Sequence, residues 1–142
     1  MPDGLILTRF QYRAMRRHVS RRLPLEACGL LAGRMSPDGK SARVELTIGV
    51  PNAERSPVRF RMPPRLQLRA FQKIEAAGLE LAGIYHSHPN GPETPSPTDL
   101  AEAAYPAASL IWSRREGKWQ VRGFRIAGGK FDEIPLQIIN GW

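Results

Sequence analysis

The sequence predicts an α+β fold in which a single, mostly antiparallel sheet is flanked by about three helices. Segments with apolar residues at helical intervals alternate with short segments whose apolar pattern is typical of strands. Prolines and glycines separate these segments, so each has a defined start and end. The 142 residues, 42% of them hydrophobic, suffice for one compact core. We therefore expect one domain over residues 1–142.

The first half of the chain predicts a helix followed by three strands. Thr8 and Gln11 have capping-box spacing, and the apolar residues after them predict a helix over 9 to about 21. The apolar run CGLLAG predicts a buried strand. Two segments with alternating apolar residues follow, 44–50 and 58–62, which we interpret as strands joined by the polar sequence PNAERSP.

The second half predicts two helices, a strand and a C-terminal meander. Pro63 and Pro64 can open a helix that Gly78 terminates. A strand is predicted over 81–88, and a further helix over about 97–105. The remainder predicts an antiparallel meander with strands at 110–112, 119–126 and 131–139.

The chain is basic, with 21 lysines and arginines against 13 aspartates and glutamates and a net charge of +8. Six arginines gather on and just after the first predicted helix: Arg9, Arg13, Arg16, Arg17, Arg21 and Arg22. A basic surface attracts polyanions or an acidic protein partner. No aromatic interleaving or nucleic-acid motif accompanies these arginines, so we interpret them as a solvated helix face and do not expect nucleic-acid binding.

Cysteine usage and hydropathy indicate the compartment. Cys28 has no partner for a disulfide within the chain, which favours a reducing compartment, and we expect it to be a buried small residue rather than a nucleophile. The N-terminus turns polar too early for a secretory signal, and no run approaches the roughly 18 apolar residues of a membrane span. A cytoplasmic protein without a membrane segment is expected.

Two of the three histidines lie at the end of a predicted strand, where His86 and His88 share one face and can converge on an ion. Histidines at strand ends are often only packed or hydrogen-bonded, so this pair alone is weak. After a loop rich in Pro and Gly, Ser96 has the form of a helix N-cap and Asp99 that of the third helical residue. Two imidazoles and a carboxylate would leave a fourth position open, as in catalytic zinc sites. A simple capping box is the alternative, and the spacing leaves both open.

The segments HSHP and SPTD resemble the signature of the JAMM metallopeptidases, also called MPN-plus or JAB domains. The resemblance implies the MPN fold, which is similar to that of cytidine deaminases. It further implies that His86, His88 and Asp99 bind one Zn²⁺ per chain and that Ser96 assists at the oxyanion. The context LPLEACGLLAG matches that of the family's catalytic glutamate and implies that Glu26 is the general base. Spacing alone could not select Glu26 among the glutamates.

The segment PNAERSPVRFRM resembles small stand-alone bacterial members of the family. This implies hydrolysis of the amide bond after the C-terminal glycine of a ubiquitin-like or sulfur-carrier protein with a Gly-Gly tail, releasing cysteine or deconjugating lysine. We expect the tail to add to the edge of the predicted strand 58–62. The alternative is a RadC-like or nucleic-acid-associated JAB protein whose arginine-rich helix binds a polyanion. We expect Trp112, Trp119 and Trp142 to form core or oligomer contacts rather than a stacking platform, and a homodimer is a separate expectation.

Overall fold

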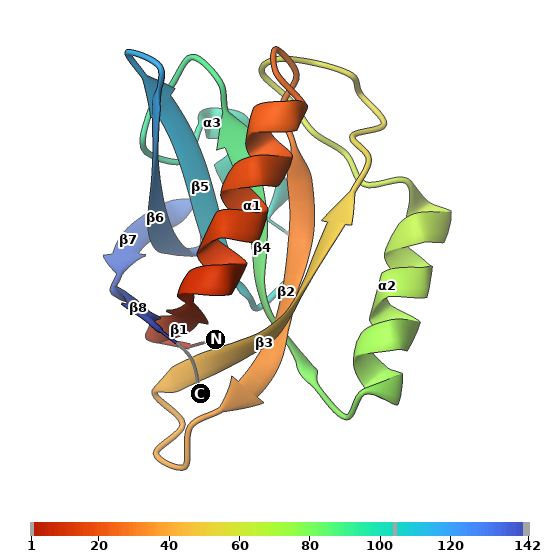
Figure 1. The fold of residues 1–142 in the computed structure, drawn as a ribbon, viewed down its shortest axis with the longest axis vertical. Coiled ribbons are helices and arrows are strands. Elements are labelled where there is room, and N and C mark those ends of the chain that lie inside the picture. The colour runs from red at the N-terminus through yellow and green to blue at the C-terminus, as the bar shows by residue number, and fades with distance from the viewer. Residues whose placement is uncertain (1, 104, 141–142) are drawn as a thin grey trace.

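A computed structural model of the protein describes residues 2–103 and 105–140 as one eight-stranded sheet with three helices (Figure 1). The elements in chain order are β1 (Gly4–Thr8), α1 (Arg9–Arg21), β2 (Cys28–Met35), β3 (Ser41–Val50), α2 (Pro64–Ala76), β4 (Glu80–His88), α3 (Pro97–Glu102), β5 (Ala108–Arg115), β6 (Lys118–Ala127), β7 (Lys130–Ile134) and β8 (Leu136–Ile139). The order across the sheet is β7-β6-β5-β4-β2-β3-β1-β8. The expected α+β fold is confirmed.

The sheet is mixed, so the expectation of a mostly antiparallel sheet is wrong in this respect. The strand β1, which the sequence analysis did not predict, pairs in parallel with both β3 and β8. The strands β4 and β5 are also parallel. Parallel neighbours need a long crossover connection, and the loop and helix α3 between β4 and β5 provide it. The other four pairs are antiparallel.

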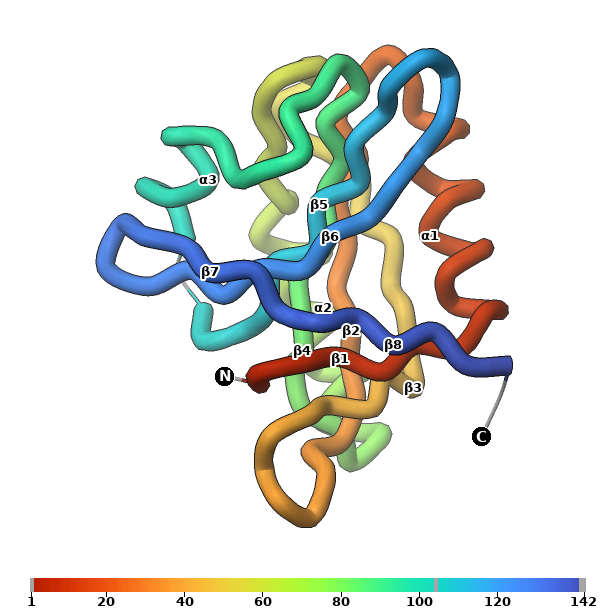
Figure 2. The backbone as a smooth tube through the Cα atoms, turned by 90° about the vertical axis from the view of Figure 1, so that its left-hand side faces the viewer, coloured from red at the N-terminus to blue at the C-terminus, as the bar shows by residue number. Residues whose placement is uncertain are grey.

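The C-terminal segment connects the two ends of the strand order. Its first part, β7, pairs with β6 and completes the predicted meander β5-β6-β7. Its second part, β8, pairs instead with β1, and Figure 2 shows the two parts as one continuous trace across the molecule. They meet at Pro135, which has no N–H to donate to a ladder, while its carbonyl accepts from the backbone N–H of Leu5 at 3.1 Å. The predicted strand 131–139 is therefore two strands.

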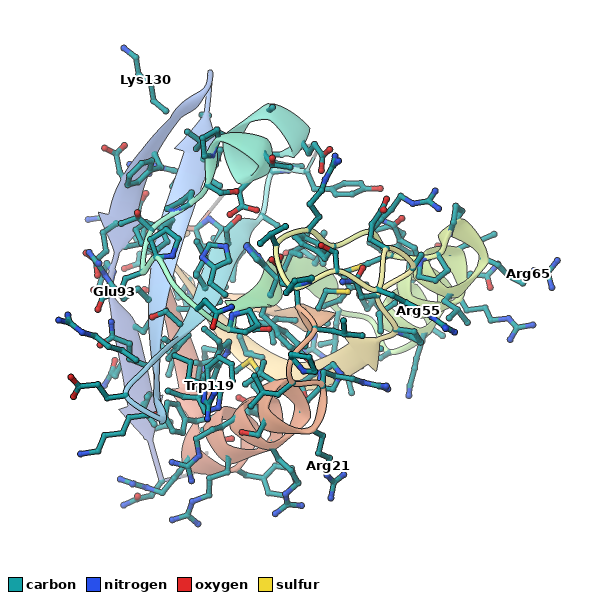
Figure 3. All side chains as sticks on the ribbon, turned by 90° about the horizontal axis from the view of Figure 1, so that it is seen from above. Arg21, Arg55, Arg65, Glu93, Trp119 and Lys130 are labelled. Atoms are coloured by element: carbon teal, nitrogen blue, oxygen red, sulfur yellow. The ribbon has the colours of Figure 1, made fainter. Side chains whose placement is uncertain are left out.

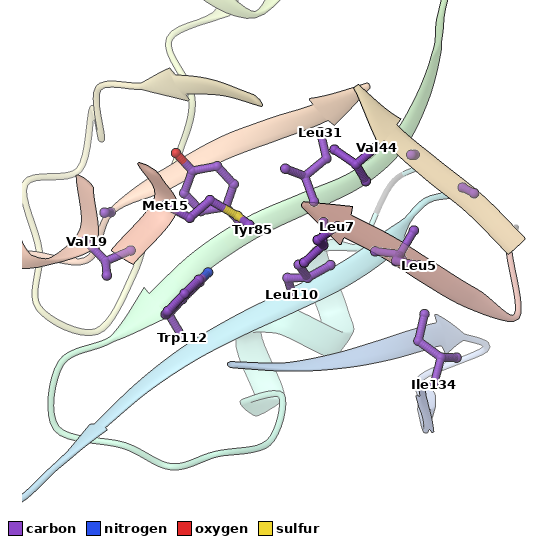
Figure 4. Packing of buried hydrophobic residues seen from close by; sticks show 14 residues of the cluster. Leu5, Leu7, Met15, Val19, Leu31, Val44, Tyr85, Leu110, Trp112 and Ile134 are labelled. Atoms are coloured by element: carbon purple, nitrogen blue, oxygen red, sulfur yellow. The ribbon is translucent and has the colours of Figure 1, made fainter. Parts of the chain in front are cut away.

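Side-chain alternation along β2 divides the interior into two hydrophobic cores. Leu31 belongs to the core under α1, which also contains Leu7, Val19, Tyr85 and Trp112 (Figure 4). The neighbours of Leu31 on either side point to the opposite face and pack with residues of α2; this second core includes Leu30, Ala32, Ala70 and Ile74. The sheet therefore has α1 on one face and α2 on the other.

The segment 58–62 is part of a loop, so the predicted strand there is wrong. Here the side chain of Asn52, rather than a neighbouring strand, is the partner of backbone groups. Its Oδ1 accepts from the N–H groups of Glu54 and Arg61, both at 3.0 Å. The alternating apolar pattern has another cause, because Met62 is buried in the second core and Phe60 packs against it. None of the described helices is long and apolar enough to cross a membrane.

Candidate metal and active site

Three side-chain donor atoms converge where β4 ends and α3 begins. His86 and His88 are the first and third of the last three residues of β4, and both are buried. Their Nε2 atoms lie 3.1 Å apart, and each lies 3.1 Å from Oδ2 of Asp99. Donors on a tetrahedral zinc ion, with bonds of about 2.0–2.1 Å, would be about 3.3 Å apart. The triangle therefore has the size of one face of such a site.

The loop after β4 holds one of the imidazoles in the orientation that a metal needs. Nδ1 of His88 lies 2.7 Å from the carbonyl oxygen of Pro92. Because a carbonyl only accepts, Nδ1 carries a proton and donates it, so in the neutral imidazole the Nε2 lone pair faces the triangle, and in the protonated ring Nε2 donates to Asp99. Burial lowers the pKa of His86, whereas for His88 the hydrogen bonds to Asp99 and Pro92 outweigh burial and raise the pKa.

Asp99 is held as an anion in a largely buried place. Its side chain is 8% exposed, and burial by itself would raise its pKa. The hydrogen bonds to His86 and His88, and one from the backbone N–H of Ser96 at 2.8 Å, together hold the pKa of Asp99 well below its usual range. The carboxylate is thus ionised at neutral pH and supplies the charge that a divalent cation requires.

Glu26 reaches the same place from a distant part of the chain. It precedes β2, whose Cys28 pairs with His86, so the register of these two strands brings Glu26 to the end of β4. Its side chain is buried, and its Oε1 has no hydrogen-bond partner. Donor atoms of Glu26, His86, His88 and Asp99 all lie within 4.8 Å of one another, and we call these four residues the Glu-His-His-Asp cluster. Burial raises the pKa of Glu26 to about 8.

Ser96 caps α3, and its hydroxyl keeps a proton that it can donate. Its Oγ accepts from the backbone N–H of Asp99 at 3.0 Å, and its own N–H donates to Asp99 Oδ2, so the capping box is present. A hydroxyl that accepts one hydrogen bond still has its proton to donate. Ser96 can therefore cap α3 and donate to a substrate beside the Glu-His-His-Asp cluster.

Aromatic and apolar side chains that were not predicted from the sequence line one side of the site. The ring of Phe60 stacks on that of His86, with centroids 4.6 Å apart and an angle of 23° between the planes. Beside them lies a cavity of about 290 Å³ that His86 and Asp99 border. Its apolar lining includes Phe60, Met62, Ile84, Ala107 and Ile126. The alternating pattern over 58–62 was the available signal, and it reflected this lining rather than a strand.

The cluster is compatible with a bound metal ion. Two imidazole nitrogens and one carboxylate oxygen are donors that zinc prefers, and the buried Glu26 Oε1 without a partner calls for a further polar group at the site. Nε2 of the neutral His88 ring and Oδ2 of Asp99 lie 3.1 Å apart and are both acceptors, so a bound cation would satisfy both. The residues present therefore fit the group that the sequence analysis expected.

Other residues of interest lie away from the cluster. His18 contacts the hydroxyl of Tyr85 through Nδ1 at 2.6 Å. Cys28 is fully buried and burial raises its pKa to about 12, so it stays a thiol. Trp112 is buried in the core under α1 and Trp119 packs against that core, whereas Trp142 lies outside the described residues.

The arginines of the first helix face solvent, as Figure 3 shows for Arg21. Arg9 donates from Nε to the side-chain oxygen of Asn140 at 3.3 Å. The other five arginines on or just after α1 form no ion pair with a carboxylate of the described residues. These five are Arg13, Arg16, Arg17, Arg21 and Arg22. This leaves a basic surface available to a partner.

Comparison with known proteins places the chain in a family. Residues 10–126 match the family described as prokaryotic homologs of the JAB domain. The chain is 38% identical over 128 residues to the CysO-cysteine peptidase of Mycobacterium tuberculosis, covering 89% of this chain and 85% of the relative. It is 37% identical over 140 residues to the probable TtuB-protein conjugate cleaving protease of Thermus thermophilus, covering 98% and 82%.

Two solved structures share the fold of this chain. A protein from Desulfitobacterium hafniense superposes with a TM-score of 0.84 at 35% identity, covering 94% of this chain and 92% of that protein. A protein from Salinibacter ruber gives a TM-score of 0.70 at 28% identity, covering 93% and 90%. The chain therefore belongs to the family of prokaryotic homologs of the JAB domain, which confirms the resemblance to JAMM metallopeptidases carried by its HSHP and SPTD segments.

Proposed function

We propose that the protein is a zinc-dependent peptidase that hydrolyses the amide bond after the C-terminal glycine of a ubiquitin-like or sulfur-carrier protein. The observation that carries this proposal is the convergence of Glu26 with the two histidines and Asp99, because it joins a metal-binding triangle to a group that can move protons. The hydrolase class is confirmed by the peptidases among the relatives. Their names, together with a desampylase of Pyrococcus furiosus, support the substrate class.

Each residue of the site has a distinct part in the proposed reaction. His86, His88 and Asp99 would hold the metal, which would supply Lewis-acid chemistry by acidifying a water molecule and polarising the scissile carbonyl. Glu26 accepts a proton from the attacking water and returns it to the leaving amine. Its buried surroundings keep its pKa within reach of neutral pH, as a group that both accepts and returns a proton requires. The Ser96 hydroxyl donates to the oxyanion that forms at the carbonyl.

The surroundings of the cluster bear on the substrate. Because 58–62 is a loop, a peptide tail cannot add to a strand edge there, and the apolar cavity beside His86 is a better place for the residue next to the scissile bond. A tail that ends in Gly-Gly has no side chain to fill this cavity. We therefore propose that the cavity receives the leaving cysteine or lysine. The basic surface of α1 suits an acidic carrier. The Gly-Gly tail, the homodimer and the cytoplasmic location stay predictions.

The test is cleavage of a purified sulfur-carrier protein that bears a C-terminal cysteine, and of a carrier conjugated to lysine, by protein loaded with zinc. Glu26→Gln should retain the metal and lose about 10²- to 10⁴-fold in turnover, the usual contribution of a general base. The matched control is Glu75→Gln on the exposed side of α2, which should cleave as fast as the wild type. Failure of the zinc-loaded wild type on both substrates would overturn the proposal.

A further inference from the structure

The Glu26 carboxyl is aimed at the cluster without a hydrogen bond to hold its Oε1. The direction of the carboxyl therefore depends on the position of the Glu26 backbone and on the packing around the buried Glu26 side chain. Regular pairing between β2 and β4 begins only at Cys28, so the backbone of Glu26 and Ala27 lies just outside that ladder. Buried backbone groups outside a ladder need partners elsewhere, and those partners determine where the chain sits.

All four backbone polar groups of Glu26 and Ala27 have partners. The Glu26 N–H donates to the carbonyl of Ser56 at 2.8 Å, and the Glu26 carbonyl accepts from Nδ2 of Asn52 at 3.0 Å. The Ala27 N–H donates to Oγ of Ser87 at 2.8 Å, and the Ala27 carbonyl accepts from the Ser87 N–H at 3.0 Å. Two of these four bonds come from side chains, those of Asn52 and Ser87.

We propose that Asn52 and Ser87 are positioning residues that hold the backbone of Glu26 and Ala27 and so aim the Glu26 carboxyl at the metal-binding triangle of the other three cluster residues. This inference rests on the proposed role of Glu26 as the general base. Neither side chain has a donor atom in the cluster, so both act through Glu26.

Ser87 links the strand of the two histidines to the residue next to Glu26. It lies between His86 and His88 on β4, and because side chains alternate, it points to the opposite side of the strand from both. It is fully buried, and its Oγ is the acceptor for the Ala27 N–H. The histidines and Glu26 are thereby held in a common register by a bond that an alanine at position 87 would remove.

Asn52 couples Glu26 to the loop beside it. Its Nδ2 donates both to the Glu26 carbonyl and to the carbonyl of Arg59, the latter at 2.8 Å, while its Oδ1 accepts from Glu54 and Arg61. This uses two donors and two acceptors, the full capacity that an asparagine amide has in this geometry and that an aspartate lacks. One side chain therefore joins the backbone of Glu26 to the loop that carries Phe60 against His86.

The test uses Asn52→Ala, Ser87→Ala and the control Ser56→Ala in the full-length, zinc-loaded protein. Ser56→Ala removes a hydrogen bond of the same loop, from Val58 N–H to Ser56 Oγ, but keeps the carbonyl that accepts from Glu26. Because a misplacement of about 1 Å can cost about 10²-fold, we expect kcat to fall by about 10- to 100-fold in the first two variants with zinc content unchanged, and KM to stay unchanged in Ser87→Ala. The control should keep the wild-type kcat.

A double-mutant cycle separates positioning from general damage. In a Glu26→Gln background, Asn52→Ala should lower the residual turnover by less than about twofold, because the group through which it acts is already removed. An equal loss in both backgrounds would overturn the inference, as would a wild-type kcat in both single variants. Should Ser87→Ala not fold, the cycle with Asn52→Ala decides alone.

A second readout does not depend on activity. The rate of amide hydrogen exchange at Ala27 can be measured by NMR. It should be about fivefold faster in Ser87→Ala than in the wild type, because the Ala27 N–H loses its hydrogen bond to Ser87 Oγ. It should not change in Ser56→Ala. Unchanged exchange at Ala27 would overturn the role of Ser87. If the wild type cleaves no carrier substrate while Ala27 exchange rises as expected, the proposed function fails and the positioning of the backbone stands.

Discussion

The protein contains two capping boxes with the same local geometry and different surroundings. At the start of α1, Gln11 N–H donates to Thr8 Oγ1 at 3.1 Å and Thr8 N–H donates to the Gln11 side chain at 2.9 Å. At the start of α3, Asp99 N–H donates to Ser96 Oγ at 3.0 Å and Ser96 N–H donates to Asp99 Oδ2 at 2.8 Å. Each box satisfies two backbone donors at a helix start.

The boxes differ in what the third helical residue meets beyond its own helix. The Gln11 amide donates from Nε2 to the backbone carbonyl of Val44 at 2.7 Å, which attaches α1 to β3. Asp99 instead places the same oxygen that completes its box 3.1 Å from both histidines. An amide can join two neutral structural elements, whereas a carboxylate brings charge to a pair of imidazoles. One local motif therefore attaches a helix to the sheet in one place and, in the proposed site, holds a metal ligand in the other.

The largest effect is expected from removing the charge at the second box. Asp99→Asn keeps an oxygen that can accept from Ser96 N–H but no longer supplies an anion, so the purified variant should lack stoichiometric zinc and its cleavage activity should fall to background. Metal analysis after gel filtration measures this. Gln11→Ala is the control, since it should bind zinc as the wild type does. An Asp99→Asn protein with one zinc per chain would remove Asp99 from the metal site.

The next largest effect is expected from the two capping hydroxyls. Ser96→Ala should retain zinc and lose about 10²- to 10³-fold in kcat, as removal of an oxyanion donor does elsewhere. Thr8→Ala removes the same hydroxyl at α1 and should leave kcat unchanged. Steady-state cleavage of the carrier substrate compares them. Equal kcat values in these two variants would mean that Ser96 only caps its helix.

The structural box should show its effect in stability. Gln11→Ala deprives both the Thr8 N–H and the Val44 carbonyl of a buried partner, which should lower the free energy of unfolding by about 2 kcal/mol. Thr8→Ala loses one capping bond and should lower it by about 1 kcal/mol. Urea denaturation of the zinc-loaded proteins measures both. A larger loss in Thr8→Ala than in Gln11→Ala would contradict the role of the Val44 contact.

The smallest effect concerns His18, on the α1 side of the sheet. Burial, and then the charge of Arg22, lower its pKa, so between that value and the ordinary value of about 6.5 the unfolded chain binds more protons than the folded one. The free energy of unfolding should therefore fall as the pH drops below about 6.5, by up to about 1.4 kcal/mol per pH unit from this group.

A His18→Gln variant should lack this contribution, so its stability relative to the wild type should rise as the pH drops from 8 to 5. Urea titrations of the metal-free proteins exclude acid release of the metal, and His86 and His88 titrate alike in both chains. A constant difference between the two proteins over this range would show that His18 does not titrate differently in the folded state.

Features that depend on neighbours in the chain could be predicted. Both capping boxes were visible as residue spacing, and α2 begins at Pro64 and ends just before Gly78, whose positive φ of 70° suits glycine. The third helix was predicted too long, since α3 ends at Glu102. The alternation that places His86 and His88 on one face of β4 is likewise a property of a single strand.

Features that depend on pairing between distant segments could not. No local pattern indicates that GLILT forms β1 between β3 and β8. Nor does any local pattern indicate that the backbone of 58–62 forms a hydrogen bond with Asn52 within a loop instead of pairing with a strand. Ser87 and Asn52 carry no signal in the sequence, because their partners lie in segments far away along the chain.

The sequence by itself placed the two histidines on one face of a strand and the serine and carboxylate at one helix start, because short-range spacing is fixed within an element, and it left a metal site and a simple capping box both open. Spacing could not select Glu26, which only the family resemblance implied, and the tertiary structure shows what brings it beside them. The carboxyl comes from a segment about 60 residues upstream, and its position follows from the register of β2 against β4 and from the side chains of Asn52 and Ser87. Spacing within an element is set by backbone geometry, whereas the approach of distant elements is set by packing of the whole chain.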